Sequence, residues 1–314
     1  MTSKKSPIEC FADPIFTDPE AAREYLEAQR WPDGPYCPHC GATENMKRLE
    51  GKSHRPGLFA CNQCRGHFSV TVGTVYERSH VPLHKWLLAV HLLTSSRKGM
   101  SAHQLHRTLG VTYKTAWFMA HRIRESMKDT SGEPMGGKGK VVEADETYLG
   151  TPEYRFHRAQ GWKPKTGSQK KAIALVERGG EARALKVDDL TQKSVREFVV
   201  RNADRDSVLS TDEAGYFKPV GREFKRHWTV NHSIGQYGRG MAHSNTIEGY
   251  WSIFKRGMKG IYQHCGEQHL QRYLDEFSFR YSNRHVTDGE RRDEALKGIT
   301  GKRLTYRTNG SAPF

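Results

Sequence analysis

The sequence has few apolar residues and no long hydrophobic run. Apolar residues make up 36% of the 314 positions, and the mean hydropathy is -0.77. No stretch approaches the ~18 apolar residues that a membrane-spanning helix needs. Residues 1–19 also lack the apolar core of a signal peptide. These absences argue against a membrane or secreted protein, and we expect a cytoplasmic one.

Acidic residues are in short supply as well. Lys and Arg number 50 against 35 for Asp and Glu, which gives a net charge of +15 and a pI near 9.6. A basic excess favours a polyanionic partner, because neutralised phosphates release their condensed counterions. Solubility is the alternative explanation, so charge alone does not establish nucleic-acid binding. The length predicts two or three structural units.

Cysteine is scarce, and most of it is grouped. Two of the six cysteines, Cys10 and Cys265, stand alone, and the others form two Cys-x-x-Cys pairs: Cys37, Cys40, Cys61 and Cys64. In a reducing compartment such pairs indicate metal or redox chemistry rather than structural disulfides. Two intervening residues let both thiolates of a tight turn reach one tetrahedral ion, so the pairs predict a four-thiolate zinc site. A redox motif is the alternative, but no βαβ pattern surrounds either pair.

The residues around these pairs, 16–80, predict a zinc ribbon. Residues 41–60 suit a short β-hairpin, and Phe68, Val70 and Val72 alternate as strand residues do. Bound zinc would stabilise a piece too small to fold alone. The pattern leaves open whether the ribbon contacts DNA or protein.

Residues 81–128 predict a helix-turn-helix-like DNA-binding segment. Apolar residues recur at helical spacing, Gly110 ends a short second helix, and Thr112 is suited to cap a third. That third helix would lie in a major groove with its first residues nearest the bases. We expect DNA contacts from Thr112, Tyr113, Lys114, Thr115 and Arg122. An ordinary three-helix packing unit with a solvated basic face is the alternative.

After a glycine-rich linker at 129–140, residues 141–291 predict an α/β domain, followed by a basic tail at 292–314. Three strands, a helix and a fourth strand are expected at residues 141–145, 171–177, 183–187, 192–202 and 207–212. This order resembles the ribonuclease-H-like layout, in which a mixed central sheet carries helices on its faces. The chain as a whole is therefore predicted to be multidomain.

Two strands of this domain end in acids, Asp145 and Asp212, 67 positions apart. In the ribonuclease-H-like layout these ends lie side by side, where carboxylate oxygens suit divalent hard cations. Glu143 and Glu146 flank the first acid and are alternative ligands. Strand alternation puts Glu143 on the side of Asp145 and Glu146 on the other side, which disfavours Glu146.

Residues 244–259 predict a helix that carries a third candidate acid, Glu248. Lys255 follows Glu248 by seven positions, two turns along the same face, and suits phosphate contact, with Arg256 beside it. Asn245 lies one turn before Glu248, and its amide oxygen suits a metal or its bound water. Both Asn245 and Glu248 therefore remain candidates for the third position.

The motif strings VVEADETYLG, LSTDEAGYF and HSNTIEGYWSIFKRGMKGIYQHC, with the ribbon and the helix-turn-helix, resemble insertion-sequence transposases of the ISXO type. The resemblance covers about residues 16–291. It implies that Asp145 and Asp212 are the first two catalytic acids. The family is ambiguous at the third, where some members use asparagine. The 35 residues between Asp212 and Glu248, and Lys255 beyond, favour Glu248.

The resemblance also implies an activity. A bacterial, nucleoid-associated enzyme would bind the ends of its element, hydrolyse one strand and join the freed 3′-hydroxyl to target DNA, as a homo-oligomer on DNA. Two Mg2+ ions ~3.5–4 Å apart, with Mn2+ able to substitute, would serve both steps. The alternatives are a zinc-ribbon regulator with an inactive catalytic domain and a ribonuclease-H-like nuclease that does not join strands.

Overall fold

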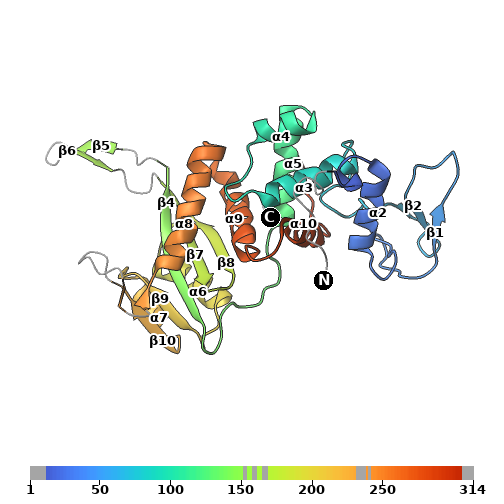
Figure 1. Cartoon of the computed structure of the whole chain (residues 1–314). Coiled ribbons are helices and arrows are strands. Elements are labelled where there is room, and N and C mark those ends of the chain that lie inside the picture. Colours follow the sequence, from blue (N-terminus) through green and yellow to red (C-terminus); the bar gives the residue numbers. More distant parts are fainter. Residues whose placement is uncertain are drawn as a thin grey trace. The chain divides into compact units, whose positions relative to one another are not determined.

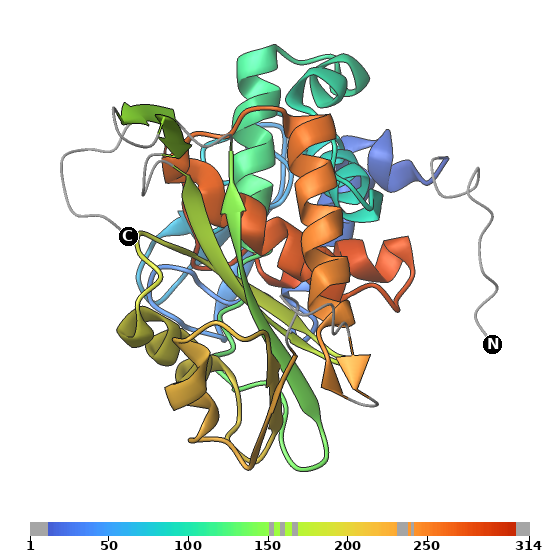
Figure 2. The ribbon, with the colours of Figure 1, turned by 90° about the vertical axis from the view of Figure 1, so that its left-hand side faces the viewer.

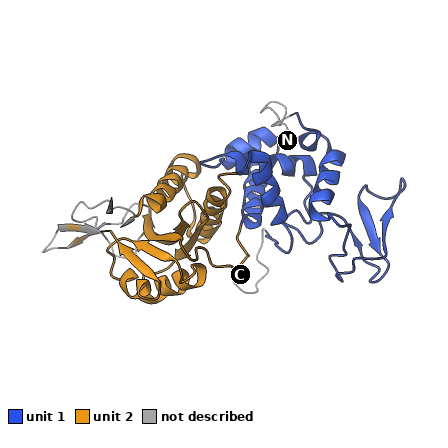
Figure 3. Ribbon diagram, turned by 60° about the horizontal axis from the view of Figure 1, so that its bottom comes forward, with its two compact units in different colours: residues 1–127, 286–314 blue, residues 128–285 orange. Residues whose placement is uncertain are grey.

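A computed structural model describes residues 12–150, 154–157, 161–164, 169–230, 238–239 and 242–305 of the chain. It divides into two units: residues 1–127 with 286–314 form unit 1, and residues 128–285 form unit 2 (Figure 3). Within the described residues, no helix is both long and apolar enough to cross a membrane.

Unit 1 opens with a helix and a three-stranded antiparallel sheet. The elements are η1 (Pro14–Phe16), α2 (Pro19–Arg30), β1 (Met46–Leu49), β2 (Leu58–Cys61) and β3 (His67–Phe68). Asp18 starts α2, because its carboxylate accepts a hydrogen bond from the Glu20 N–H. The pairing of β1 with β2 forms the hairpin expected between the cysteine pairs.

The third ribbon strand is shorter than the alternation of Phe68, Val70 and Val72 predicted. It ends at Phe68, because the Arg30 guanidinium donates to the carbonyl oxygens of Val70 at 2.6 Å and Val72 at 2.8 Å. These carbonyls bind a side chain instead of a neighbouring strand.

Three helices follow: α3 (Leu83–Ser95), α4 (Ala102–Leu109) and α5 (Tyr113–Ser126). The Ser101 hydroxyl caps α4, and Gly110 ends it in the left-handed conformation, with φ of 60°. The Thr112 hydroxyl accepts the Thr115 N–H and so caps α5. The helices and turn lie where the sequence predicted them.

The C-terminal part of the chain differs from the expected basic tail. Helix α10 (Asp288–Lys297) crosses the predicted boundary at residue 291 and packs on α3 and α2 within unit 1. Arg291 donates to the Thr94 carbonyl at the end of α3, and the Tyr25 hydroxyl donates to Asp293. Residues 306–314 of the predicted tail lie outside the described part of the chain.

Unit 2 is built on a five-stranded mixed sheet in the order β10-β9-β4-β7-β8 (Figure 1). The strands are β4 (Val141–Leu149), β7 (Lys170–Glu177), β8 (Ala182–Val187), β9 (Val208–Thr211) and β10 (Arg226–Thr229). Central β4 pairs antiparallel with β7 and parallel with β9. This arrangement agrees with the ribonuclease-H-like layout.

Helices cover both faces of the sheet (Figure 1, Figure 2). They are α6 (Gln192–Asn202), α7 (Phe217–Gly221), α8 (Asn245–Gly257) and α9 (Leu270–Ser282), with the turns η3 (Met258–Tyr262) and η4 (Glu267–His269) between the last two. On β4, Val142 and Ala144 pack against α6 and α7. By alternation, Glu143 and Asp145 belong to the opposite face, where α8 and α9 pack.

Two small hairpins extend from this core. They pair β5 (Tyr154–His157) with β6 (Gly161–Pro164), and β11 (Gly238–Arg239) with β12 (Ala242–His243). Phe156 and Trp162 are cross-strand partners with exposed rings. The second hairpin leads directly into α8.

The glycine-rich stretch at 129–140 is part of unit 2 rather than a free linker. Met135 is buried and bridges to Ala203. The Gly136 N–H donates to Glu177, and the Gly137 N–H donates to the Ser207 hydroxyl at 2.8 Å. Side chains of unit 2 therefore hold the backbone that enters β4.

Gly136→Ala should destabilise unit 2 more than Gly139→Ala. Both glycines have positive φ, 96° and 84°, which costs a substituted residue about 1–2 kcal/mol. A Cβ at Gly136 would also lie 2.2 Å from Ser207 Oγ and 2.9 Å from Val142, whereas the space at Gly139 is open. We expect a further loss of about 1–3 kcal/mol for the crowded site in urea unfolding. Equal losses would contradict this packing.

Candidate active site

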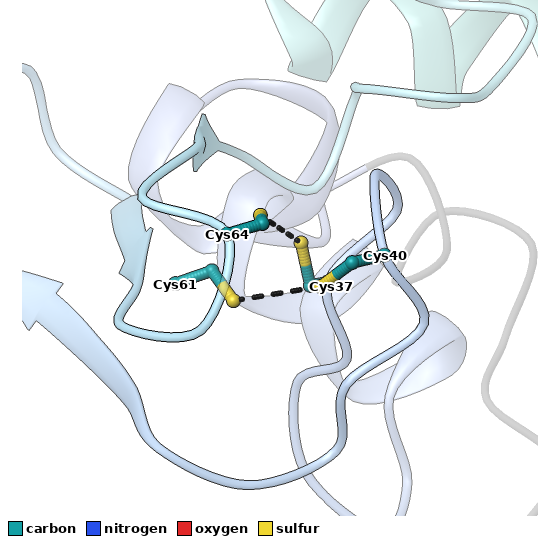
Figure 4. Close-up of side chains that lie close together, drawn as sticks. All are labelled: Cys37, Cys40, Cys61 and Cys64. Carbon is teal, nitrogen blue, oxygen red and sulfur yellow. Dashed lines mark hydrogen bonds between the residues drawn. The ribbon is translucent and has the colours of Figure 1, made fainter.

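The four paired cysteines converge on one point in unit 1 (Figure 4). All four sulfur atoms lie within 4.8 Å of one another, with Cys37 and Cys64 Sγ atoms 3.6 Å apart and those of Cys40 and Cys61 3.7 Å apart. A tetrahedral Zn–S₄ centre with bonds of about 2.3 Å has sulfur atoms about 3.8 Å apart. A disulfide would need about 2.05 Å. The donor set therefore fits zinc.

Two similar backbone turns present the sulfurs. Gly41 N–H donates to the Cys37 carbonyl and Arg65 N–H to the Cys61 carbonyl, at 2.9 and 2.8 Å. Both turn residues have positive φ, 79° and 61°. His39 is exposed, with its Nε2 3.3 Å from the His67 carbonyl oxygen, as expected of a residue at the tip of the turn.

In unit 2, Asp145 and Asp212 come together as the sequence predicted. The parallel register of β4 and β9 sets Ala144 opposite Thr211, and the residue that follows each of them in the chain is an acid. Asp145 lies within β4, which continues to Leu149, rather than at the strand end that the sequence suggested. Asp212 comes directly after β9, and its Oδ1 accepts the Ala214 N–H at 3.0 Å.

Glu146 joins this pair, contrary to the alternation argument. Carboxylate oxygens of Asp145, Glu146 and Asp212 lie within 4.8 Å of one another. Strand β9 ends opposite Ala144, so beyond that point β4 has no paired strand on the β9 side, where side chains from its two faces can approach each other. Asp145 Oδ1 also turns along the strand to accept the Glu146 N–H at 2.9 Å. The sequence signal for this arrangement was that Glu146 directly follows Asp145. The two-residue period of a strand argued against it.

The carboxylates of this cluster are partly buried and repel one another. Burial, reinforced by the charges of Glu146 and Asp212, raises the pKa of Asp145 from 3.8 to about 8, and Glu248 adds to the effect. Burial also raises the pKa of Glu146, although the Tyr216 hydroxyl donates to it. Among the described residues, no hydrogen-bond donor reaches the buried Glu146 Oε2. An all-oxygen set with an orphaned oxygen fits a divalent hard cation.

Glu143, the other flanking acid, has a different role. It is fully buried, and its carboxylate accepts from Arg178 Nε at 2.6 Å and from the Ile247 backbone N–H at 2.9 Å. These partners occupy both of its oxygens. Sequence reasoning did not identify this arrangement, because the partners lie 35 and 104 positions away.

Helix α8 carries the remaining predicted residues on its exposed side. Asn245, Glu248, Lys255 and Arg256 are all exposed, while Ile247, Trp251 and Phe254 are buried on the sheet side. The Ser244 hydroxyl donates to Glu248 Oε1 at 2.8 Å. In the described structure, Glu248 stands outside the 4.8 Å group of acids.

The predicted DNA contacts divide between exposed and buried positions. Thr112, Tyr113 and Lys114 are exposed at the start of α5, and Thr115 is half-buried. Arg122 does not fit a DNA contact. It is buried, and its guanidinium donates to the Glu77 carbonyl at 2.8 Å and the Leu304 carbonyl at 3.3 Å. Its position two turns into α5 places it on the face that packs into unit 1.

We expect about one zinc ion per chain, bound by the four thiolates. Cys61→Ser should lose the metal and destabilise the ribbon, because zinc binding and folding are coupled. Cys265→Ser is the matched control, since Cys265 is also buried but lies in unit 2. Mass spectrometry of the purified variants measures the zinc content. Full zinc occupancy in Cys61→Ser would refute the assignment.

The raised pKa of Asp145 predicts that the free energy of unfolding of the metal-free protein decreases as pH rises. Its folded pKa of about 8 exceeds the ordinary 3.8, so ionisation makes folding less favourable as pH rises through that window. The Tm of Asp145→Asn minus that of the wild type should therefore grow from about pH 4 to about pH 8 and then level off. Each kcal/mol corresponds to about 2–4 °C. Mg2+ should raise the Tm of the wild type but not that of Asp145→Asn. A Tm difference that stays constant with pH would count against the prediction.

Each of the two sites lies in a region that matches a family of known proteins. Residues 136–282 match the ISXO2-like transposase domain family, and residues 17–67 match the transposase zinc-ribbon domain family. A Halobacterium salinarum protein, described as an uncharacterized protein in transposable element ISH50, is 28% identical over 278 residues. The alignment covers 84% of this chain and 91% of that protein. The chain therefore matches a transposase zinc-ribbon family and, after it, an ISXO2-like transposase family, in the order that its motifs predicted.

Proposed function

We propose that this chain is a DNA transposase that cleaves the ends of an insertion sequence and joins them to target DNA. The observation that carries the proposal is the meeting of Asp145 and Asp212 on adjacent parallel strands of a domain that matches a transposase family. The basic charge of the chain and the zinc ribbon ahead of this domain support a DNA substrate.

Asp145 and Asp212 are the proposed principal ligands of two Mg2+ ions, for which Mn2+ can substitute. Glu248 is the proposed third ligand, from α8. Glu146 is proposed as a further ligand, because its carboxylate lies beside those of Asp145 and Asp212. Bound there, such ions would lower the pKa of an attacking water and stabilise negative charge on the leaving oxygen. Asn245 remains the alternative to Glu248, because both lie on the exposed side of the same helix.

The reaction has two displacements at phosphorus. Water first replaces the 3′ oxygen at the element end, which leaves a 5′-phosphate and a free 3′-hydroxyl. That hydroxyl then replaces a 3′ oxygen of the target strand, so one phosphodiester forms as another breaks. Lys255 and Arg256, exposed in the last turn of α8, are proposed to hold the DNA phosphates.

DNA binding is proposed to begin in unit 1. Thr112, Tyr113 and Lys114 are exposed at the start of α5, with Thr115 beside them, and these residues would contact the element end. Tyr113 is held by stacking on the His103 ring, with 4.3 Å between centroids. We further propose that the protein acts in the cytoplasm on nucleoid DNA, as a homo-oligomer that brings two ends together.

Asp145→Ala and Asp212→Ala should each abolish strand cleavage while binding of the element end persists, because each removes a proposed metal ligand of unit 2 and leaves α5 of unit 1 unaltered. The assay uses labelled DNA containing the element ends with Mg2+ or Mn2+. A second substrate with pre-cut ends and a plasmid target tests joining. Cleavage that survives either substitution would refute the catalytic assignment. Cleavage without joining would identify a nuclease, and binding without either would identify a regulator.

Single substitutions should rank the remaining candidates for the metal site. Glu146→Gln alters a member of the 4.8 Å group of acids, whereas Glu248→Gln and Asn245→Ala alter residues of α8, so the losses of activity report which group is essential. We expect Glu248→Gln to reduce cleavage by more than the about 10–100-fold that loss of a hydrogen-bonding partner of a metal ligand typically costs. Asn245→Ala should have a smaller effect. The reverse order would assign the third position to asparagine.

A further inference from the structure

The start of α8 is held by groups from other parts of unit 2. The Ser244 hydroxyl stands at the N-cap position but donates to Glu248 Oε1 instead of accepting a helix N–H. The N–H of Ile247, in the first turn, is accepted by Glu143 Oε2 at 2.9 Å. A carboxylate on β4 thus takes the role that a local cap usually has.

A second set of contacts holds the residue before this turn. The His243 carbonyl oxygen accepts from the Ser210 hydroxyl at 2.8 Å and from Arg178 Nη2 at 2.9 Å. Arg178 also donates from Nε to Glu143 Oε1 at 2.6 Å. One guanidinium therefore connects the cap of α8 to the backbone that leads into it.

The sheet register places these groups beside the acidic pair. Glu143 and Ser210 are direct partners across the parallel strands β4 and β9. Each precedes an acid by two positions, Asp145 on β4 and Asp212 after β9. Residues two apart on a strand share a face. The pair of Glu143 and Ser210, which contacts α8 and the residue before it, therefore comes two positions before the pair of acids.

We propose that Glu143, Ser210 and Arg178, together called the α8 anchor, are positioning residues that set Glu248 relative to Asp145 and Asp212. This inference rests on the proposed metal-dependent function. The negative charge of Glu143 suits the positive end of the helix dipole, and its full burial limits movement. Because Glu143 and Ser210 come two positions before Asp145 and Asp212, a fixed helix start fixes the distance from the third ligand to the first two.

The test compares Glu143→Gln with Glu276→Gln in the full zinc-bound chain. Glu276 is an equally buried carboxylate of unit 2, paired with Arg280 at 3.0 Å and accepting from the Tyr262 hydroxyl, but it lies on α9. We expect Glu143→Gln to weaken Mn2+ binding, followed by electron paramagnetic resonance, at least about 10-fold. Hydrogen exchange of the first turn of α8 should accelerate in the same variant. Glu276→Gln should leave both nearly unchanged.

A double-mutant cycle identifies the path of the effect. If Glu143 acts through Glu248, then Glu143→Gln with Glu248→Gln should bind Mn2+ no more weakly than Glu248→Gln alone. Additive losses would overturn the proposal, as would equal Mn2+ affinity in Glu143→Gln and wild type. Ser210→Ala removes one hydrogen bond and keeps the question decidable if Glu143→Gln misfolds; it should weaken Mn2+ binding several-fold.

Failure of the proposed function gives a different result. A wild-type chain that binds Mn2+ but neither cleaves nor joins DNA would contradict transposition, while the metal and exchange measurements would still decide the anchor. A wild-type chain that binds no Mn2+ would overturn the anchor proposal together with the metal site.

Discussion

The parallel pairing of β4 with β9 is the constraint on which unit 2 depends. It makes neighbours of two acids that are 67 positions apart, and the same pairing puts Glu143 opposite Ser210 one step earlier. A slip of one residue would turn each side chain to the opposite face. Apolar residues on both faces of the sheet, covered by α6 and α7 on one side and α8 and α9 on the other, oppose such a slip.

Charge is distributed unevenly along this basic chain. The net excess of +15 coexists with three half-buried carboxylates gathered within 4.8 Å. A DNA phosphate would be drawn to the surface as a whole yet repelled at the cluster itself. A divalent cation between the phosphate and the carboxylates would remove the repulsion. DNA binding and cation binding at this site are therefore expected to favour each other.

The ribonuclease-H-like layout that the order of elements resembles predicted the pairing of Asp145 with Asp212. Local signals in the sequence predicted the zinc cysteines, the helices α3, α4 and α5, and four of the five strands of the central sheet. They depend on spacing and on residues close in the chain. The position of Glu146 was predicted incorrectly, because it depends on where the neighbouring strand β9 ends. The exposure of Arg122 was predicted incorrectly, because carbonyl groups far away in the sequence bind its guanidinium. The same limit hid Glu143, whose role depends on a helix about a hundred residues later.

Helix α10 gives the chain a nested order. It completes the packing around α3 in unit 1. All of unit 2 is nevertheless synthesised between residues 1–127 and residues 286–314, the two segments that form unit 1. On the ribosome the ribbon can therefore fold around its zinc early, whereas α3 keeps an uncovered apolar side until residues 288–297 emerge. Unit 1 therefore reaches its final form only after unit 2 has been made.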